Sequence, residues 1–74
     1  MIETYRIESL GPDAEGGELV QRIFVRAGSL DAAKERALRV FRRARVPQHR
    51  GPAVETVRVL DGAGYEVFSV SARD

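Results

Sequence analysis

The clearest hydrophobic pattern in the chain is a helical stripe in its middle. Apolar residues recur at offsets 0, 3, 7, 10, 11 and 14 from Leu30 to Ala44, the spacing of one face of an α-helix. Ser29 stands where an N-cap is favoured, and Pro47 follows where the helix must end. The pattern predicts a helix over about residues 30–45, with Phe41 at the centre of its buried stripe.

Four other segments are rich in β-branched and aromatic residues, as strands are. They are Ile2–Glu8, Leu19–Arg26, Val54–Leu60 and Tyr65–Ala72. The first two are separated by a loop over Gly11–Gly17, and the last two by Asp61–Gly64, which is typical of a hairpin turn. The chain therefore predicts one domain over residues 1–74 with the element order ββαββ.

A short internal repeat relates the two predicted hairpins. The segment Ile2–Ile7 matches Val54–Val59 position by position, and each copy is followed by a glycine-containing turn and another strand. Either a duplication or a shared constraint on two amphipathic strands explains the match. Both predict an α+β fold, a four-stranded antiparallel sheet with one helix on one face. A pseudo-twofold between the hairpins predicts the strand order second, first, third, fourth.

Side chains on a strand alternate between the two faces of a sheet, so each strand divides into two sets. We expect the helix-facing set to be Tyr5, Ile7, Leu19, Ile23, Val25, Val57, Val59, Phe68 and Val70. We expect the opposite face to carry Thr4, Arg6, Val20, Arg22, Phe24, Arg26, Thr56, Arg58, Leu60, Tyr65, Val67, Ser69 and Ser71. These thirteen positions include four arginines and two aromatics, and no acid.

Three interpretations of this opposite face remain open. A second copy of the chain covers it, with an apolar centre and a rim of arginines. Alternatively, Phe24 and Tyr65 stack on bases while the arginines contact phosphates of a single-stranded nucleic acid. In the third, arginine stems simply cover a modestly apolar solvent face. The candidate partner-binding residues are Phe24, Arg22, Arg26, Arg6, Arg58, Tyr65 and Val67.

Charge is balanced overall but unevenly placed. The net charge is +1, yet the segment from Lys34 to Arg50 holds seven basic residues and one acid, which leaves −5 on the rest. Basic residues late in a helix also complement its dipole, so a solvated face is the simpler interpretation. The alternative is phosphate binding by Arg42, Arg43, Arg45 and Arg50.

Candidate chemistry is sparse. The chain has no cysteine and one histidine, which excludes thiol chemistry and multi-histidine metal sites. His49 has no acid near it in sequence to orient it as a base, so we expect a solvated loop residue. The acidic residues Asp13, Glu15 and Glu18 lack the spacing of a calcium-binding loop. We expect no catalytic residue, metal, cofactor or small-molecule substrate.

The length of 74 residues limits what one core can supply. A domain of this size gains roughly 3–5 kcal/mol from its core, so association is a common way to add buried area. The longest apolar runs span three residues, as in Ile23–Val25, which excludes a membrane-spanning helix. The first residues show no signal-peptide pattern. We expect a cytoplasmic protein.

A resemblance to a known group can be stated from two segments. Ser29–Leu38 and Val57–Val67 together resemble a group of short alphaproteobacterial proteins of unknown function, and the similarity runs from about Arg22 to Val70. The resemblance implies the ββαββ pattern and carries no activity or functional residue with it.

These observations predict a small non-enzymatic binding domain. The leading hypothesis is a homodimer formed through the sheet face or an edge strand. The alternative is a single-stranded nucleic-acid-binding protein that uses the arginine and aromatic residues of the sheet face. Salt dependence distinguishes the two hypotheses: nucleic-acid binding weakens steeply as the salt concentration rises, whereas association through an apolar dimer interface does not.

Overall fold

The computed structural model describes residues 2–12 and 18–72. The elements are β1 (Glu3–Leu10), β2 (Leu19–Ala27), α1 (Leu30–Ala44), β3 (Thr56–Leu60) and β4 (Glu66–Ser71). Glu18 is exposed just before β2. Asp13 and Glu15, the other two residues of the acidic loop discussed above, lie outside the described residues.

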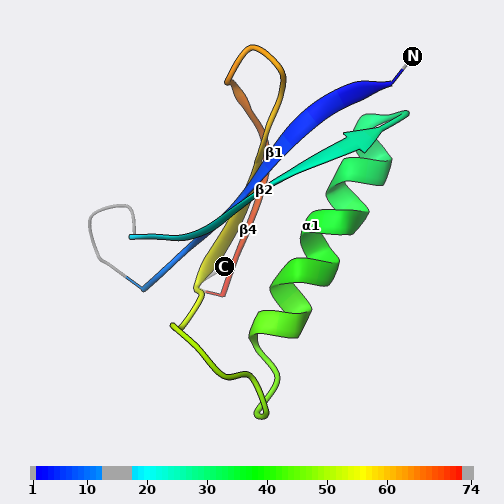
Figure 1. Ribbon diagram of the computed structural model, residues 1–74. Helices are drawn as coiled ribbons and strands as arrows, with labels where there is room; N and C mark the ends of the chain where they lie inside the picture. The colour runs from blue at the N-terminus through cyan, green and yellow to red at the C-terminus, as the bar shows by residue number, and fades with distance from the viewer. Residues whose placement is uncertain (1, 13–17, 73–74) are drawn as a thin grey trace.

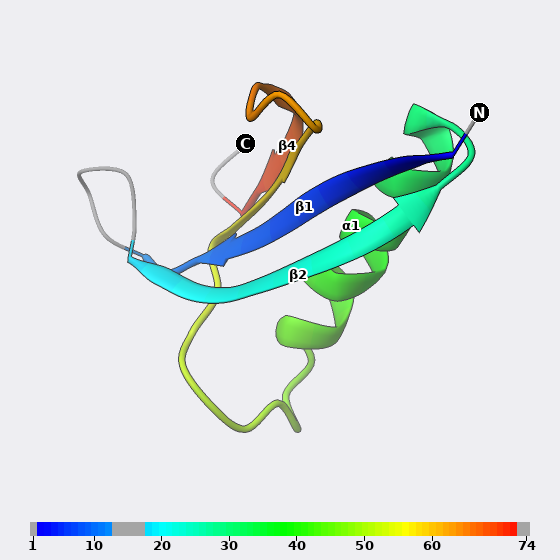
Figure 2. The same ribbon diagram turned by 45° about the horizontal axis from the view of Figure 1, so that its top comes forward.

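The strands form one antiparallel sheet in the order β2-β1-β3-β4, and α1 lies across one face of it (Figure 1). The two central strands are therefore the two copies of the repeat, as the pseudo-twofold predicts. The sheet is strongly twisted, and the long strands β1 and β2 curve together away from β3 and β4 (Figure 2). The predicted α+β fold and strand order are confirmed.

The helix begins and ends where its local sequence indicates. The Ser29 side chain accepts a hydrogen bond from the Ala32 backbone N–H at 3.2 Å, and Ser29 itself is extended. Asp31 lies in the first turn and Arg42 in the last, both in the favourable sense for the helix dipole. The last helical residue is Ala44, one position before the predicted end.

The core lies between α1 and the two central strands. Ala33 and Ala37 are fully buried, and their small side chains let the helix approach Val57 and Val59, which are also fully buried. Phe41, expected at the centre of the buried stripe, is only partly buried and packs at the margin of this core. The strands, rather than the helix, supply the large buried side chains.

Two irregularities in the sheet alter the expected alternation. A register shift in the pairing of β1 with β2 at Ser9/Leu10 sets Leu19 opposite Leu10, so Leu19 leaves the helix-facing set and is 45% exposed. The prediction for Leu19 is therefore wrong. The prediction of Val20 on the opposite face is also wrong, because Val20 packs against the core in place of Leu19. A second shift, at Val59/Leu60, accompanies the start of β4.

The turn between β3 and β4 follows the predicted hairpin chemistry. One carboxylate oxygen of Asp61 accepts hydrogen bonds from the backbone N–H groups of Ala63 at 2.9 Å and Tyr65 at 3.0 Å. Gly64 has a φ of 90°, a conformation that favours glycine. Tyr65 belongs to this turn and not to the strand, because β4 begins one residue later.

Candidate binding face of the sheet

Strand pairing defines the face of the sheet turned away from α1, here called the outer face. Tyr5 and Ile7 point into the core, so Thr4, Arg6 and Glu8 of β1 point to the other side. Residues directly opposite each other on paired strands share a face. The outer face therefore also carries Arg22, Phe24 and Arg26 of β2, Arg58 and Leu60 of β3, and Ser69 of β4.

At the centre of the outer face, three arginines surround one carboxylate. Glu8 lies directly between Arg22 and Arg58, its partners on the two neighbouring strands. The Nε of Arg22 donates to Oε2 of Glu8 at 2.9 Å, and the Nε of Arg58 donates to Oε1 at 2.8 Å. A second nitrogen of Arg58, Nη2, lies 2.6 Å from Oε1. We call Glu8, Arg6, Arg22 and Arg58 the arginine cluster.

Arg6 has the weakest contact with Glu8 of the three arginines in the cluster. Its Nε lies 3.1 Å from Oε2 of Glu8 but makes no hydrogen bond, and it is the one buried side-chain nitrogen or oxygen of the described residues without such a partner. The Glu8 side chain is 2% exposed, whereas the three arginine side chains are 34–46% exposed. One buried carboxylate thus faces three partly exposed arginine side chains, which leaves a net charge of +2 on the cluster.

Glu8 is the residue that sequence reasoning missed. The outer face was expected to carry no acid. This expectation is wrong, because Glu8 continues the alternation of Thr4 and Arg6 along β1 and so lies on the same face. The predicted strand ended at Glu8, whereas β1 runs on to Leu10. The alternation alone could have placed Glu8 on this face, but not the contacts with Arg22 and Arg58, which are 14 and 50 residues away.

Burial and the neighbouring arginines act on the ionisation of Glu8 in opposite directions. Burial raises the pKa of Glu8, but hydrogen bonds from Arg58 and Arg22 and the charges of Arg58 and Arg6 outweigh it and hold the pKa below its ordinary value of 4.5. The folded state therefore binds the proton less readily than the unfolded state. Ionised Glu8 stabilises the fold above pH 4.5, and this contribution is lost as the pH falls through the lowered pKa.

This linkage predicts a pH-dependent difference between the wild type and the Glu8→Gln variant. The difference in their free energies of unfolding is expected to be constant from about pH 7 to 5 and to shrink below pH 4.5, because only the wild type loses a charge at this position. Urea denaturation of both proteins at about pH 7, 5 and 3 measures it. A difference that stays the same at every pH would contradict the lowered pKa.

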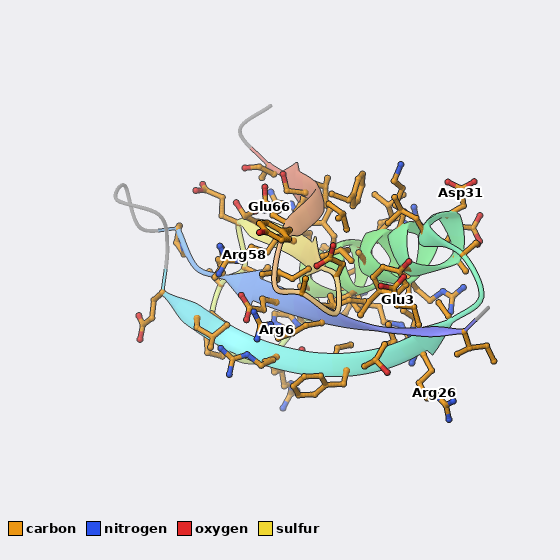
Figure 3. All side chains as sticks on the ribbon, turned by 90° about the horizontal axis from the view of Figure 1, so that it is seen from above. Glu3, Arg6, Arg26, Asp31, Arg58 and Glu66 are labelled. Carbon is orange, nitrogen blue, oxygen red and sulfur yellow. The ribbon has the colours of Figure 1, made fainter. Side chains whose placement is uncertain are left out.

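An exposed aromatic residue adjoins the arginine cluster. Phe24 lies directly opposite Arg6 and is 67% exposed, so its predicted orientation away from α1 is confirmed. A shallow hollow joins it to Thr4 and to the β3–β4 turn at Asp61. Arg26, opposite Thr4, projects away from α1 at the far end of β2 (Figure 3). Phe24 and Arg26 thus extend the cluster along the edge strand.

Other apolar residues of the outer face are covered. Leu60 and Leu10 are 6% and 8% exposed although neither belongs to the core between helix and sheet. The stems of the neighbouring arginines can cover such residues while their charged ends stay in water. Val67 was predicted on this face as a partner contact, which is wrong: it lies at the register shift between β3 and β4 and is partly buried against the core. Tyr65 is 72% exposed, but on the turn rather than on a strand.

The predicted phosphate-binding arginines lie elsewhere. Arg42 and Arg43 are exposed in the last turn of α1, and Arg50 is exposed in the connector to β3. The guanidinium of Arg45 lies 5.5 Å from the centre of the Phe41 ring and donates to the Val54 carbonyl at 3.3 Å. This set belongs to the helix side of the molecule and is separate from the arginine cluster.

Within residues 2–12 and 18–72, no group of acids and histidines is arranged to hold a metal ion. No helix of the described chain is long and apolar enough to cross a membrane. The comparisons with known proteins add no relative: no protein-family model matches the chain, nor does any curated protein or solved structure. The class of this protein is therefore defined only by its fold and its surface: it is a ββαββ domain with a positively charged sheet face.

Proposed function

We propose that this protein is a non-enzymatic binding domain that holds a single-stranded nucleic acid on its outer face. In this proposal Phe24 stacks on a base, and the arginine cluster and Arg26 contact the phosphates. The supporting observation is the arrangement of the arginine cluster: a net charge of +2 beside an aromatic side chain that is 67% exposed. Sheet faces that bind single strands combine these same two features.

Glu8 has a defined place in this proposal. It fixes the guanidinium group of Arg22 through Nε and that of Arg58 through Nε and Nη2, so that their remaining N–H groups are presented to a ligand in a set orientation. Guanidinium groups recognise phosphate well because their N–H donors form a rigid planar fork. A single carboxylate does not neutralise three arginines, so the cluster still attracts an anion.

The charge of the outer face also argues against a homodimer formed through the sheet face, one of the two forms of dimer expected from the sequence. A second copy packed face to face would place one +2 cluster against another, and like charges across an interface disfavour binding. The apolar centre expected for such an interface is also reduced, because Leu60 is buried and Val67 packs against the core.

A homodimer through the edge strand β2 is the second candidate. This strand has nine residues, has a neighbour on one side only in the described part of the chain, and carries the exposed side chains of Leu19 and Phe24. An unpaired edge of this length is a template for pairing with another chain. Such a dimer would leave the arginine cluster accessible.

Replacing Phe24 with alanine is expected to weaken binding of a single-stranded oligonucleotide by about five- to 150-fold, the contribution of one stacked base. Because the side chain is 67% exposed, the melting temperature should hardly change. Fluorescence titration of a labelled oligonucleotide measures the affinity. Sedimentation of both proteins across a dilution series tests the second candidate, which requires Phe24→Ala to weaken a dimer.

Salt dependence provides the matched control. Each phosphate contact to a single strand contributes a slope of roughly −0.7 in the logarithm of affinity against that of salt concentration. Arg26→Gln should therefore make the slope shallower by about 0.7, whereas Arg42→Gln, at the helix end, should leave it unchanged. A wild-type protein that binds no oligonucleotide, or one whose binding is lost with Arg42 instead, would exclude the outer face as the site.

A further inference from the structure

A cleft on the helix side of the molecule is separate from the outer face. It lies between α1, β2 and the connector that leads to β3, and has a volume of about 480 Å³. The connector is the loop below α1 in Figure 1. Binding sites for small molecules commonly have volumes of about 300–1,000 Å³. The cleft is therefore large enough for a small ligand.

The lining of the cleft is amphipathic. Apolar side chains come from β2, from α1 and from the connector: Val20, Ile23, Val40, Ala44, Pro52 and Val54. The cations Arg36 and Arg43 come from α1, and the imidazole of His49 comes from the connector. Neither aspartate nor glutamate contributes to the lining among the described residues.

Helical geometry explains why two of the helix arginines share this cleft and their neighbour does not. Arg36 and Arg43 are seven residues apart, almost two full turns, so both project from the same side of α1. Arg42 is rotated by about 100° from Arg43 and does not line the cleft. The cleft thus combines an apolar wall with two cations, and no acid stands beside them among the lining residues that the structure describes.

We propose that this cleft binds a small amphipathic anion, a carboxylate or phosphate head group on a short aliphatic body. The head group pairs with Arg43 and Arg36, and the aliphatic body lies on Val40, Ile23 and Val54. Charge complementarity carries the assignment, since an apolar contact alone would accept a neutral ligand, whereas the two arginines, which have no acid beside them among the described lining residues, select an anionic one. The proposal shares no residue with the outer face, so either can fail without the other.

Octanoate, below its micelle-forming concentration, is the probe, with octyl phosphate, octanol and inorganic phosphate as comparisons. Two-dimensional NMR titration of the isotope-labelled protein should show shifts of the Val40, Ile23 and Val54 resonances with octanoate and octyl phosphate. Octanol and inorganic phosphate, which each lack one half of the proposed ligand, should bind at least tenfold more weakly. Equal affinity for octanol and octanoate, or shifts elsewhere only, would overturn the proposal.

The matched pair of variants is Arg43→Gln and Arg42→Gln. Both residues are exposed in the same helical turn, so both variants are expected to fold as the wild type does. Loss of a charged hydrogen bond should weaken octanoate binding by about tenfold or more in Arg43→Gln, and Arg42→Gln should bind as the wild type does. Equal losses in the two variants would show that general positive charge, and not the cleft, attracts the probe.

Discussion

Glutamine in place of Glu8 is expected to lower the free energy of unfolding at neutral pH by about 3 kcal/mol. Breaking a buried ion pair usually costs about 3–5 kcal/mol, because the remaining charge is left without a partner. The lower end of this range applies here, since the three arginine side chains are 34–46% exposed and can turn toward water. For a domain held by one small core, such a loss is most of the total stability.

Urea denaturation monitored by circular dichroism measures this effect, and Glu66→Gln is the matched control. Glu66 is an exposed glutamate in the same sheet, at the start of β4, so its replacement should change the free energy of unfolding by less than about 0.5 kcal/mol. If Glu8→Gln were as stable as Glu66→Gln, the arginine cluster would contribute nothing to the fold.

Truncation of Ile7 to alanine is expected to have an effect of similar size. Ile7 is 1% exposed and lies at the middle of the sheet, opposite Ile23 on one side and Val59 on the other. Its removal leaves a cavity beneath α1 and should cost about 2–5 kcal/mol. Compared with a total of roughly 3–5 kcal/mol, this leaves a large part of the protein unfolded at room temperature.

Thermal unfolding tests this, with Ile2→Ala as the control of the same chemistry. Ile2 is 62% exposed just before β1, so its truncation should hardly shift the melting temperature. Ile7→Ala should melt far below the wild type or show no cooperative transition. Similar melting curves for the two variants would mean that the core is not where the structure has it.

The fold was predictable where local signals and the repeat agree. The stripe from Leu30 to Ala44, with Ser29 before it, specifies the helix through backbone capping and 3.6-residue periodicity, and both depend only on near neighbours. The strand order followed from the match of Ile2–Ile7 to Val54–Val59, which the structure places side by side. Leu19 was misplaced because a bulge inserts a residue at a point that alternation alone does not mark.

The sequence predicted the arginines of the candidate site but not Glu8, the acid that they surround. The even-numbered positions of β1 and β2 supplied Arg6, Arg22 and Phe24 correctly, since alternation decides the face. Glu8 acquires its role only through register, which sets it opposite Arg22 and Arg58. A charge that looks like an ordinary surface acid in sequence is thereby 2% exposed.

Glu8 also bears on how the domain unfolds. Arg22 belongs to the first hairpin and Arg58 to the second, so a single carboxylate ties the two hairpins together across 50 residues of chain. The position of the repeat that corresponds to Glu8 is Leu60, which has no charge to make a second such link. Neither hairpin can separate from the other without leaving this carboxylate short of a partner. The contact adds a side-chain link to the β1–β3 backbone pairing that already joins the two hairpins, and it favours their opening as one cooperative unit.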